Sequence, residues 1–220
     1  MHEYTANNET SFLQPSSRID ISNRHLPHWQ LDGAFYFVTW RLADALPQSK
    51  LHAWKKERIE WLREHPKPWN GSTRREYKKR FPRRSDEWLD RGYGECVLRT
   101  PPYAQIVFDA LLHFNGARYD MASFVVMPNH VHTLFQLRGS YSVETLAQSW
   151  KGYTARRINQ KLGRRGVLWQ AESWDRLLRG VDDLKRCFFY IKQNPAMAGL
   201  KRSEYMYYEV ENHLPESFTE

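Results

Sequence analysis

The sequence contains little cysteine, no long apolar run and no internal repeat. Its 220 residues include two cysteines, Cys96 and Cys187, which lack the Cys-x-x-Cys spacing of a redox motif or a cysteine zinc site. This usage excludes a disulfide-rich secreted fold and is typical of a reducing compartment, so we expect a cytoplasmic protein. No apolar stretch is long enough to span a membrane, and the N-terminus lacks the apolar core of a signal peptide. We therefore expect no membrane partner.

Positive charge and aromatic rings are what the chain has in quantity. The formal net charge is +8, the sequence pI is about 9.5, and aromatic residues make up 15% of the chain. Basic charge interleaved with aromatic side chains suits phosphate backbones and unstacked bases. A hydrophobic fraction of 41% indicates a globular protein rather than a disordered one. Nucleic acid is the partner that this composition favours, although ordinary solubility charge also accounts for a basic pI.

Apolar, β-branched runs alternate with helical patterns along the chain. Strands are expected at 34–42, 94–99, 118–126 and 130–137, and helices at 103–114, from Ser142 onward, and at 182–194 with Pro195 ending the last. The order is strand, helix, strand, strand, helix, followed by a further helix. It predicts an α+β fold, a ferredoxin-like antiparallel sheet with helices packed on it.

We expect one domain over residues 1–220, with three appended segments. Residues 1–30 are predicted to be a loose N-terminal arm, and residues 201–220 a C-terminal tail with a short strand or hook near 205–210. Residues 47–94 are predicted to be a helical basic insertion between two sheet elements. This insertion holds the most basic run of the chain, which suits either a solvated face or a contact with a DNA backbone.

Two histidines lie one residue apart in an apolar run that is typical of a strand. Because residues i and i+2 of a strand point to the same face, His130 and His132 are expected to project side by side. Two imidazoles on one face form half of a metal site, which needs further donors from elsewhere in the chain. The alternative is a pair of polar residues on a solvated sheet face.

Tyr190 and Asn194 are four residues apart on the last predicted helix and therefore share one face. Asn194 could give an oxygen to a metal held by the histidines, with Tyr190 one turn away. A phenol has an unperturbed pKa of about 10, so it needs activation to act as a nucleophile, and a divalent metal on a phosphodiester stabilises the charge of transfer. The alternative is structural, with Tyr190 at the rim of the core and Asn194 capping the helix before Pro195.

Several motifs, taken together in their order along the chain, resemble those of the REP-associated tyrosine transposases. These proteins are relatives of the single-tyrosine HUH transposases. They are the segments Val126–His132, Trp150–Asn159 and Tyr190–Leu200, and the resemblance runs from about His25 to Leu200. It implies His130 and His132 as metal ligands, Tyr190 as the nucleophile and Asn194 as the third ligand. It also implies Mg²⁺ or Mn²⁺ as cofactor and single-stranded DNA with hairpins of the repetitive extragenic palindrome type as substrate. The relatives act as monomers or homodimers.

The function expected from the resemblance is that of a tyrosine transposase, a DNA nicking and joining enzyme. It would work in transposition or recombination as a metal-dependent endonuclease and strand transferase, through a 5′-phosphotyrosine intermediate. A hairpin-binding protein that keeps the fold without catalysis is the alternative. A metal hydrolase using activated water is weaker, because no carboxylate base lies near His130 and His132 in the sequence.

Basic and aromatic residues of the second half of the chain are candidates for DNA contacts. Those predicted to bind phosphates, because they lie on the polar side of a helix or in a loop, are Lys151, Arg156, Arg157, Arg164 and Arg165. The aromatic side chains of Trp150, Tyr153, Trp169 and Trp174 suit base stacking, or a core position between helix and sheet, which we favour for Trp150.

Overall fold

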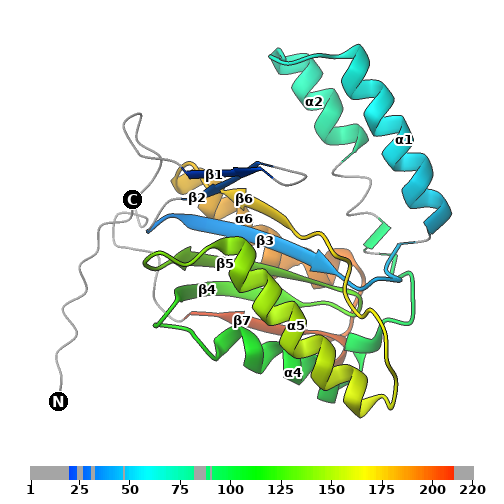
Figure 1. Ribbon diagram of the computed structural model, residues 1–220, viewed down its shortest axis with the longest axis vertical. Coiled ribbons are helices and arrows are strands. Elements are labelled where there is room, and N and C mark those ends of the chain that lie inside the picture. Colours follow the sequence, from blue (N-terminus) through cyan, green and yellow to red (C-terminus); the bar gives the residue numbers. More distant parts are fainter. Residues whose placement is uncertain are drawn as a thin grey trace.

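The computed structural model describes residues 20–23, 27–30, 33–46, 48–81, 88–89 and 91–210. Its main sheet consists of β3 (Phe35–Arg41), β4 (Tyr119–Val126), β5 (His130–Leu137), β6 (Trp174–Leu177) and β7 (Met206–Glu209). The strands lie in the order β6-β3-β5-β4-β7, and each pair of neighbours is antiparallel (Figure 1). The strand β7 confirms the short strand expected near 205–210.

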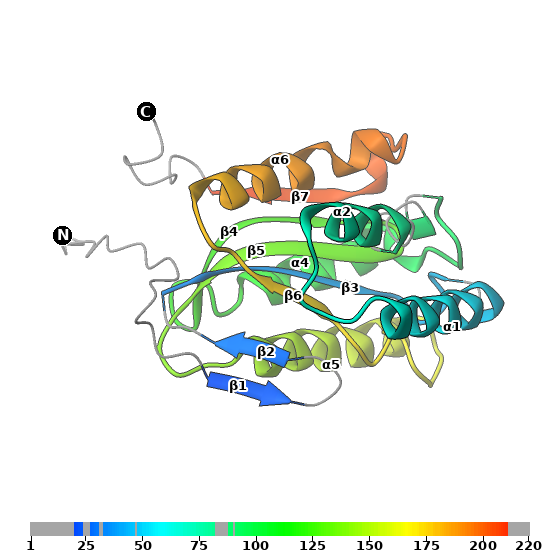
Figure 2. The ribbon, with the colours of Figure 1, turned by 90° about the horizontal axis from the view of Figure 1, so that it is seen from above.

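Helices cover both faces of this sheet. On one face lie α4 (Pro101–Leu112) and α5 (Val143–Lys161), and on the other lies α6 (Val181–Met197), as Figure 2 shows. Along the chain the elements of this layer arrangement follow as β3, α4, β4, β5, α5, β6. The four strands among them lie in the spatial order β6-β3-β5-β4. This is the ferredoxin-like arrangement, extended by β7 beside β4, so the predicted fold class is confirmed.

The alternation of side chains along β3 divides the core into two layers. Tyr36, Val38 and Trp40 pack with the α4 and α5 layer, whereas Phe35 and Phe37 pack with α6. These residues are all buried, because helices cover the sheet on both sides. The same two-residue period assigns every second residue of β5 to the α6 face.

An arm of two helices leaves the sheet after β3. It comprises α1 (Gln48–Glu64) and α2 (Gly71–Arg80), and it projects away from the body of the molecule (Figure 1). The side chain of Asn70 caps α2 by accepting from the amide of Thr73 at 2.8 Å. Most of the described part of the insertion expected at 47–94 therefore lies in these two helices, and α2 ends at Arg80, two residues before Pro82.

The strand expected at 94–99 is wrong. A 3₁₀ turn, η1 (Val97–Arg99), stands there instead. Gly94 and Cys96 have φ angles of 91° and 51°, which lie in the left-handed region and interrupt an extended strand. A side chain at position 94 would also meet the main-chain oxygen of Asp44 at 2.7 Å, so the position needs glycine.

Pro195 does not end the last helix, contrary to the prediction. It lies inside α6, whose C-cap is Ala198, and the carbonyl of Pro195 accepts from the amide of Leu200 at 2.9 Å. A proline within a helix removes one N–H donor, but Pro195 and Ile191 one turn earlier are both buried and pack the helix onto the sheet. Asn194 is consequently an interior helical residue and not a C-cap.

The ends of the chain are only partly described. Within the segment expected to be a loose arm, β1 (Asp20–Asn23) and β2 (Pro27–Gln30) form a two-stranded antiparallel sheet. The end of the predicted tail, residues 211–220, lies outside the described residues. In the described part of the chain, no helix combines the length and the apolar character that crossing a membrane requires.

Candidate functional site

The two histidines lie on β5 and face α6. His130 and His132 are 1% and 2% exposed, and their ring centroids are 4.7 Å apart. Val131, between them, packs in the opposite layer with α4 and α5. The side-by-side placement predicted from the period of the strand is confirmed, but the site is buried and not a solvated sheet face.

Each imidazole has a partner at Nδ1. His130 Nδ1 lies 2.7 Å from Asn129 Oδ1, and His132 Nδ1 lies 2.7 Å from the hydroxyl of Thr39 on β3. The register of the sheet explains the second contact, because Thr39 stands directly opposite His132. With the Nδ1 atoms engaged, the two Nε2 atoms point elsewhere, and both are buried without a hydrogen-bond partner among the described residues.

Asn129 is itself held in a fixed orientation. Its amide nitrogen donates to the carbonyls of Leu89 and Tyr93, at 3.1 and 3.2 Å. The nitrogen must therefore point toward these carbonyls, and Oδ1 toward the histidine, where it can only accept. His130 accordingly carries its proton on Nδ1 and has a lone pair on Nε2, as a metal ligand requires.

Burial keeps both histidines neutral. Desolvation lowers the pKa of His130 from 6.5 to about 3, the nearby charge of Arg41 acts in the same direction, and the side chain of Asn194 opposes them. The pKa of His132 is well below 6.5 because of burial and the neighbouring His130. Neutral imidazole is the form that binds metal ions, so neither ring needs to lose a proton at neutral pH.

The last helix brings Asn194 and Tyr190 to this pair. The influence of Asn194 on the pKa of His130 places the two side chains close together, although both side-chain atoms of Asn194 are buried and lack a hydrogen-bond partner of normal geometry among the described residues. The ring of Tyr190 meets His132 edge-on at 5.1 Å between centroids and Phe37 at 5.9 Å. The structure therefore assembles all four residues that the sequence predicted for the site.

The donor set fits a divalent metal. Of the seven buried side-chain polar atoms without a partner in the described part of the chain, four belong to this site, namely Nε2 of both histidines and the two amide atoms of Asn194. Such unpaired groups are costly in a protein interior, which indicates that something else satisfies them. No group of three or more His, Cys, Asp or Glu suitable for a metal occurs among the described residues, so an amide oxygen would have to complete this set.

A cavity of about 210 Å³ opens beside His130. The return segment of the arm, the turn before β5 and the end of α6 form its walls, and Arg91 and Arg99 line it. Arg99 Nε lies 3.4 Å from Glu204 Oε1, whereas Arg91 is exposed. Of the four candidate site residues, His130 is the one that lines this cavity, and Glu204 stands among its basic residues.

Only one of the tryptophans considered for base stacking stands near this site. Trp150 and Trp169 are buried in the layer of α5, so they belong to the core. Tyr153 is exposed on α5. Trp174 on β6 is 48% exposed, and its ring meets Phe37 at 5.9 Å, while Phe37 stacks on His132 at 5.4 Å. An exposed ring two contacts from the histidines is well placed to stack a base.

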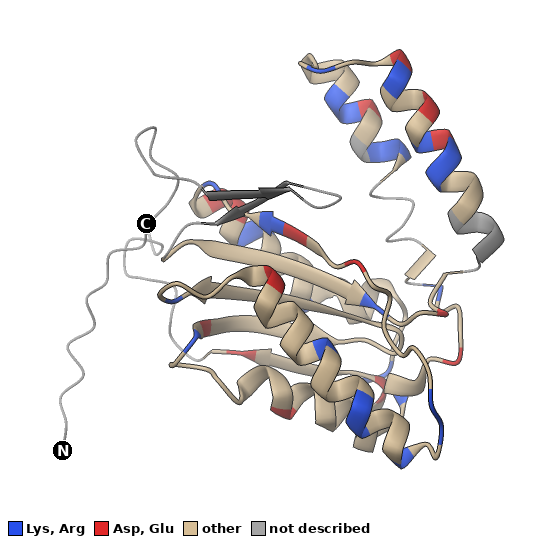
Figure 3. Cartoon of the chain, viewed as in Figure 1, with Lys and Arg blue, Asp and Glu red and all other residues tan. Residues whose placement is uncertain are grey.

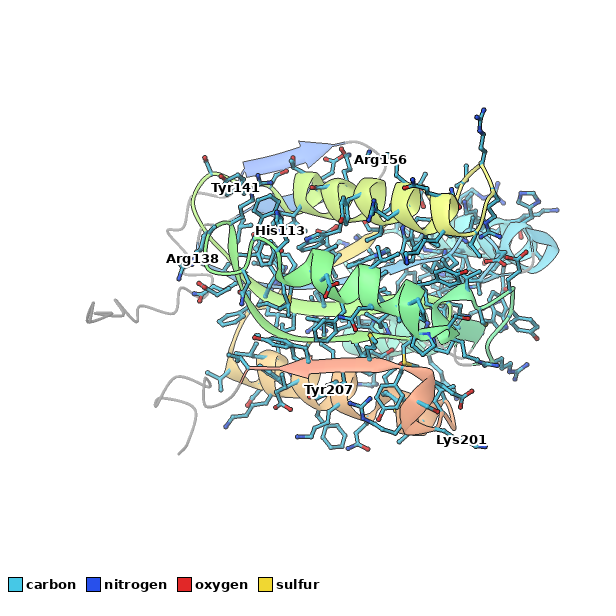
Figure 4. The ribbon with its side chains drawn as sticks, turned by 90° about the horizontal axis from the view of Figure 1, so that it is seen from below. His113, Arg138, Tyr141, Arg156, Lys201 and Tyr207 are labelled. Carbon is cyan, nitrogen blue, oxygen red and sulfur yellow. The ribbon has the colours of Figure 1, made fainter. Side chains whose placement is uncertain are left out.

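The basic residues predicted to bind phosphates are not brought to the histidines. Arg156 and Arg157 are exposed on α5, across the sheet from α6, and Figure 4 shows Arg156 on the side opposite Tyr207 of β7. Lys151 donates to the carbonyl of Ala171 at 2.7 Å, and burial lowers its pKa.

The two arginines of the loop after α5 differ in their surroundings. Arg164 is ion-paired with Glu95, at 2.5 Å. Arg165 is exposed. Arg156 and Arg157 therefore lie across the sheet from Tyr190, and DNA contacts of the five basic residues stay a prediction.

Sequence reasoning missed Asn129, Thr39 and Phe37. Asn129 could have been found, because it directly precedes His130 and a second partner for a ligating imidazole is a general requirement. Thr39 and Phe37 lie on β3, more than 90 positions from the histidines, and their role follows only from the pairing of β3 with β5.

Part of the chain is similar to known proteins. Residues 112–178 match the family model described as "Transposase IS200 like". A solved structure, "Structure of the REP associates tyrosine transposase bound to a REP hairpin", is similar with 14% identity and a TM-score of 0.41, over 82% of this chain and 76% of that one. No curated protein matches the chain. The likeness to transposases indicated by the motifs is thus confirmed for residues 112–178, which include the histidine strand and are similar to IS200-like transposases.

Proposed function

We propose that the protein is a metal-dependent enzyme that cuts and rejoins single-stranded DNA at hairpins of the repetitive extragenic palindrome type, with Tyr190 as the nucleophile. One observation carries the proposal. Two neutral imidazoles and an amide, all buried and with atoms unpaired in the described chain, meet beside a tyrosine on one face of the sheet. The match to the IS200-like transposase model supports this reaction class.

His130, His132 and Asn194 would hold the metal through Nε2 of each imidazole and the amide oxygen. Imidazole suits transition metals and an amide oxygen suits Mg²⁺ or Mn²⁺, so this mixed set fits Mn²⁺ at least as well as Mg²⁺. When bound, the ion would polarise the phosphoryl oxygens of the scissile phosphodiester. Asn129 and Thr39 keep the imidazole rings oriented, and burial keeps them neutral.

Tyr190 would supply the new bond. Its phenolic oxygen attacks phosphorus, the P–O3′ bond breaks, the phenol proton is lost, and the departing 3′ oxygen takes up a proton as a 3′-hydroxyl. The product is a 5′-phosphotyrosine, which keeps the phosphodiester energy, so the reverse attack by a 3′-hydroxyl rejoins the strand without ATP. The contacts with His132 and Phe37 restrict the tyrosine ring to the metal side of α6.

The tyrosine is tested by a single substitution. Purified protein with Mn²⁺ is incubated with a fluorescent hairpin oligonucleotide, and cleavage is followed on a denaturing gel. Tyr190→Phe is expected to abolish cleavage while leaving hairpin affinity unchanged, and Tyr207→Phe, which removes another partly buried hydroxyl from the same layer, is the matched control. Cleavage that persists in Tyr190→Phe would refute the mechanism.

A further inference from the structure

Nearly all the net positive charge of the chain lies in the arm. Residues 48–81 contain 11 of the 33 lysines and arginines but only 4 of the 25 acidic residues. The other residues are almost balanced, with 22 basic and 21 acidic side chains. Figure 3 shows the basic residues recurring along both helices of the arm. A charge concentrated on one projecting element indicates a binding surface more than a general solubility device.

The acidic side chains of the arm that have contacts are used between its two helices. Glu57 on α1 is ion-paired with Arg80 on α2 at 2.9 Å, and Glu76 accepts from the indole of Trp61 at 3.2 Å. The hydroxyl of Tyr77 on α2 accepts from Arg58 of α1 at 2.8 Å. These contacts hold the two helices together, and Glu76, which also lies 3.8 Å from Arg80, is the acidic residue of α2.

The exposed side of α2 presents cations. Arg75 and Lys79 are one turn apart on α2 and share one face, and Arg74 precedes Arg75 on the neighbouring side of the helix. All three are exposed, and the structure gives none of them an acidic partner among the described residues. Neighbouring cations without partners repel each other, and an anionic ligand bound to them relieves this repulsion.

The arm is rigid enough to present these cations as a unit. Trp61 is buried between the helices, and its ring meets those of Trp69, Tyr77 and Phe81 at 5.3 to 5.7 Å. An aromatic core of this kind gives the two helices a fixed relative position. Because the aromatic rings point inward, Ile59 is the large apolar side chain that the described arm exposes, so the surface suits phosphates better than lipid.

Both ends of the arm lie at the histidine end of the sheet. The arm follows β3, whose last residue, Arg41, stands opposite His130, and Figure 1 shows β3 running toward the end from which the arm projects. The returning chain supplies the carbonyls of Leu89 and Tyr93, which hold Asn129 and, through it, His130. A nucleic acid that follows the arm toward its base would therefore come close to the candidate active site.

We propose that the arm of residues 48–81 binds the sugar–phosphate backbone of the duplex stem of the DNA hairpin, through Arg75 and Lys79 on one face of α2 and Arg74 beside them. This inference rests on the proposed function, because it takes the hairpin as the substrate. The contacts are electrostatic and independent of base sequence. They place the stem on the arm while the single strand beside it reaches Tyr190.

The test measures binding and needs no catalysis. In the Tyr190→Phe background, with EDTA present, the affinity for a fluorescent hairpin with single-stranded flanks is measured over a series of NaCl concentrations. Arg75→Glu/Lys79→Glu is expected to weaken binding by roughly tenfold or more and to reduce the slope of log K against log salt by about 2, since each lost phosphate contact removes about 0.9. Lys161→Glu/Lys185→Glu, with the same change of charge on exposed residues of α5 and α6, is expected to leave the slope unchanged.

Two further binding measurements identify the kind of ligand. For a stemless single strand of equal length, Arg75→Glu/Lys79→Glu is expected to change affinity little. The proposal is overturned if Arg75→Glu/Lys79→Glu leaves the hairpin affinity and its salt slope unchanged. It is overturned equally if this variant loses as much affinity for the stemless strand as for the hairpin. It is also overturned if the variant loses binding only to phosphatidylglycerol-containing vesicles. A protein that binds hairpins through the arm but forms no covalent adduct contradicts the proposed function and leaves this inference standing.

Discussion

Asn129 accepts a hydrogen bond from His130 at 2.7 Å, and this contact links the candidate metal site to the base of the arm. The amide of Asn129 is fixed by two carbonyls of the chain that returns from the arm, so the imidazole is oriented by a segment outside the sheet. Orientation of a ligating histidine by a second residue sets both its tautomer and its basicity.

Replacement of Asn129 tests this link. Asn129→Ala is expected to lower Mn²⁺ affinity by roughly 10- to 100-fold, because the Nδ1 proton of His130 loses its acceptor. Calorimetric titration with Mn²⁺ measures the effect. Asn115→Ala is the matched control, since it removes an amide that accepts from the main chain of Met121 at 2.8 Å, away from the histidines. Equal metal affinity in both variants would show that Asn129 has no positioning role.

Asn194 is expected to limit the stability of the metal-free protein. Both of its polar atoms are buried without a partner among the described residues, so Asn194→Leu should stabilise the metal-free form by on the order of 1 kcal/mol. The same substitution should remove the rise in Tm that Mn²⁺ produces. Thermal unfolding with and without Mn²⁺ measures both effects.

Asn159→Leu serves as the control for this experiment. Its amide donates to the carbonyl of Gly166 at 2.8 Å, so its replacement should destabilise the protein and leave the effect of Mn²⁺ intact. If Mn²⁺ raised the Tm of Asn194→Leu as much as that of the unaltered protein, Asn194 would not be a ligand.

Acid should destabilise the metal-free protein through the histidines. The folded state holds the pKa of His130 at about 3 and that of His132 well below 6.5, so the unfolded chain binds protons that the folded protein cannot. The stability is present above pH 6.5 and is lost as the pH falls, by up to about 1.4 kcal/mol per pH unit for each histidine. Urea unfolding between pH 7.5 and pH 5 measures this slope. His130→Gln/His132→Gln should flatten it, and a slope unchanged in this variant would contradict the prediction.

Trp174 is expected to stack a base beside the scissile phosphate. Trp174→Ala should weaken the binding of the single-stranded flank by about 1–3 kcal/mol, the usual contribution of one stacked base. Fluorescence anisotropy with hairpins that carry or lack the flank separates this effect from stem binding. Tyr141→Ala removes an exposed ring near the start of α5 and is the control. A loss of affinity that is the same for both hairpins would argue against stacking at Trp174.

Much of the fold was predictable, because local patterns and packing agree there. The alternation along 130–137 placed both histidines on one face, and Ser142 caps α5 by accepting from the amide of Thr145, as its position at the start of the helix predicted. The failures occur where local rules and tertiary contacts conflict. Extended-looking residues at 94–99 turn because of left-handed backbone at Gly94 and Cys96, and Pro195 stays in α6 because the helix is packed over it.

The site was predictable only where its residues are close in sequence or belong to recognisable motifs. The roles of Thr39 and Phe37 depend on the register between β3 and β5, which no local pattern specifies. The basic residues of α5 were predicted from charge alone, and charge does not reveal which face of the sheet a helix covers. Charge alone likewise left open whether the basic run of residues 47–94 is a solvated face or a contact with DNA.

The most direct test of the phosphotyrosine mechanism follows which end of the DNA stays on the protein. A hairpin oligonucleotide labelled at its 3′ end is incubated with protein and Mn²⁺, and a second sample carries the label at the 5′ end. Attack by Tyr190 predicts that the 3′ label migrates with the protein on a denaturing gel, that the 5′ label appears on a shorter free strand, and that Tyr190→Phe gives neither. A 5′ label on the protein, or a labelled adduct in Tyr190→Phe, would contradict the mechanism.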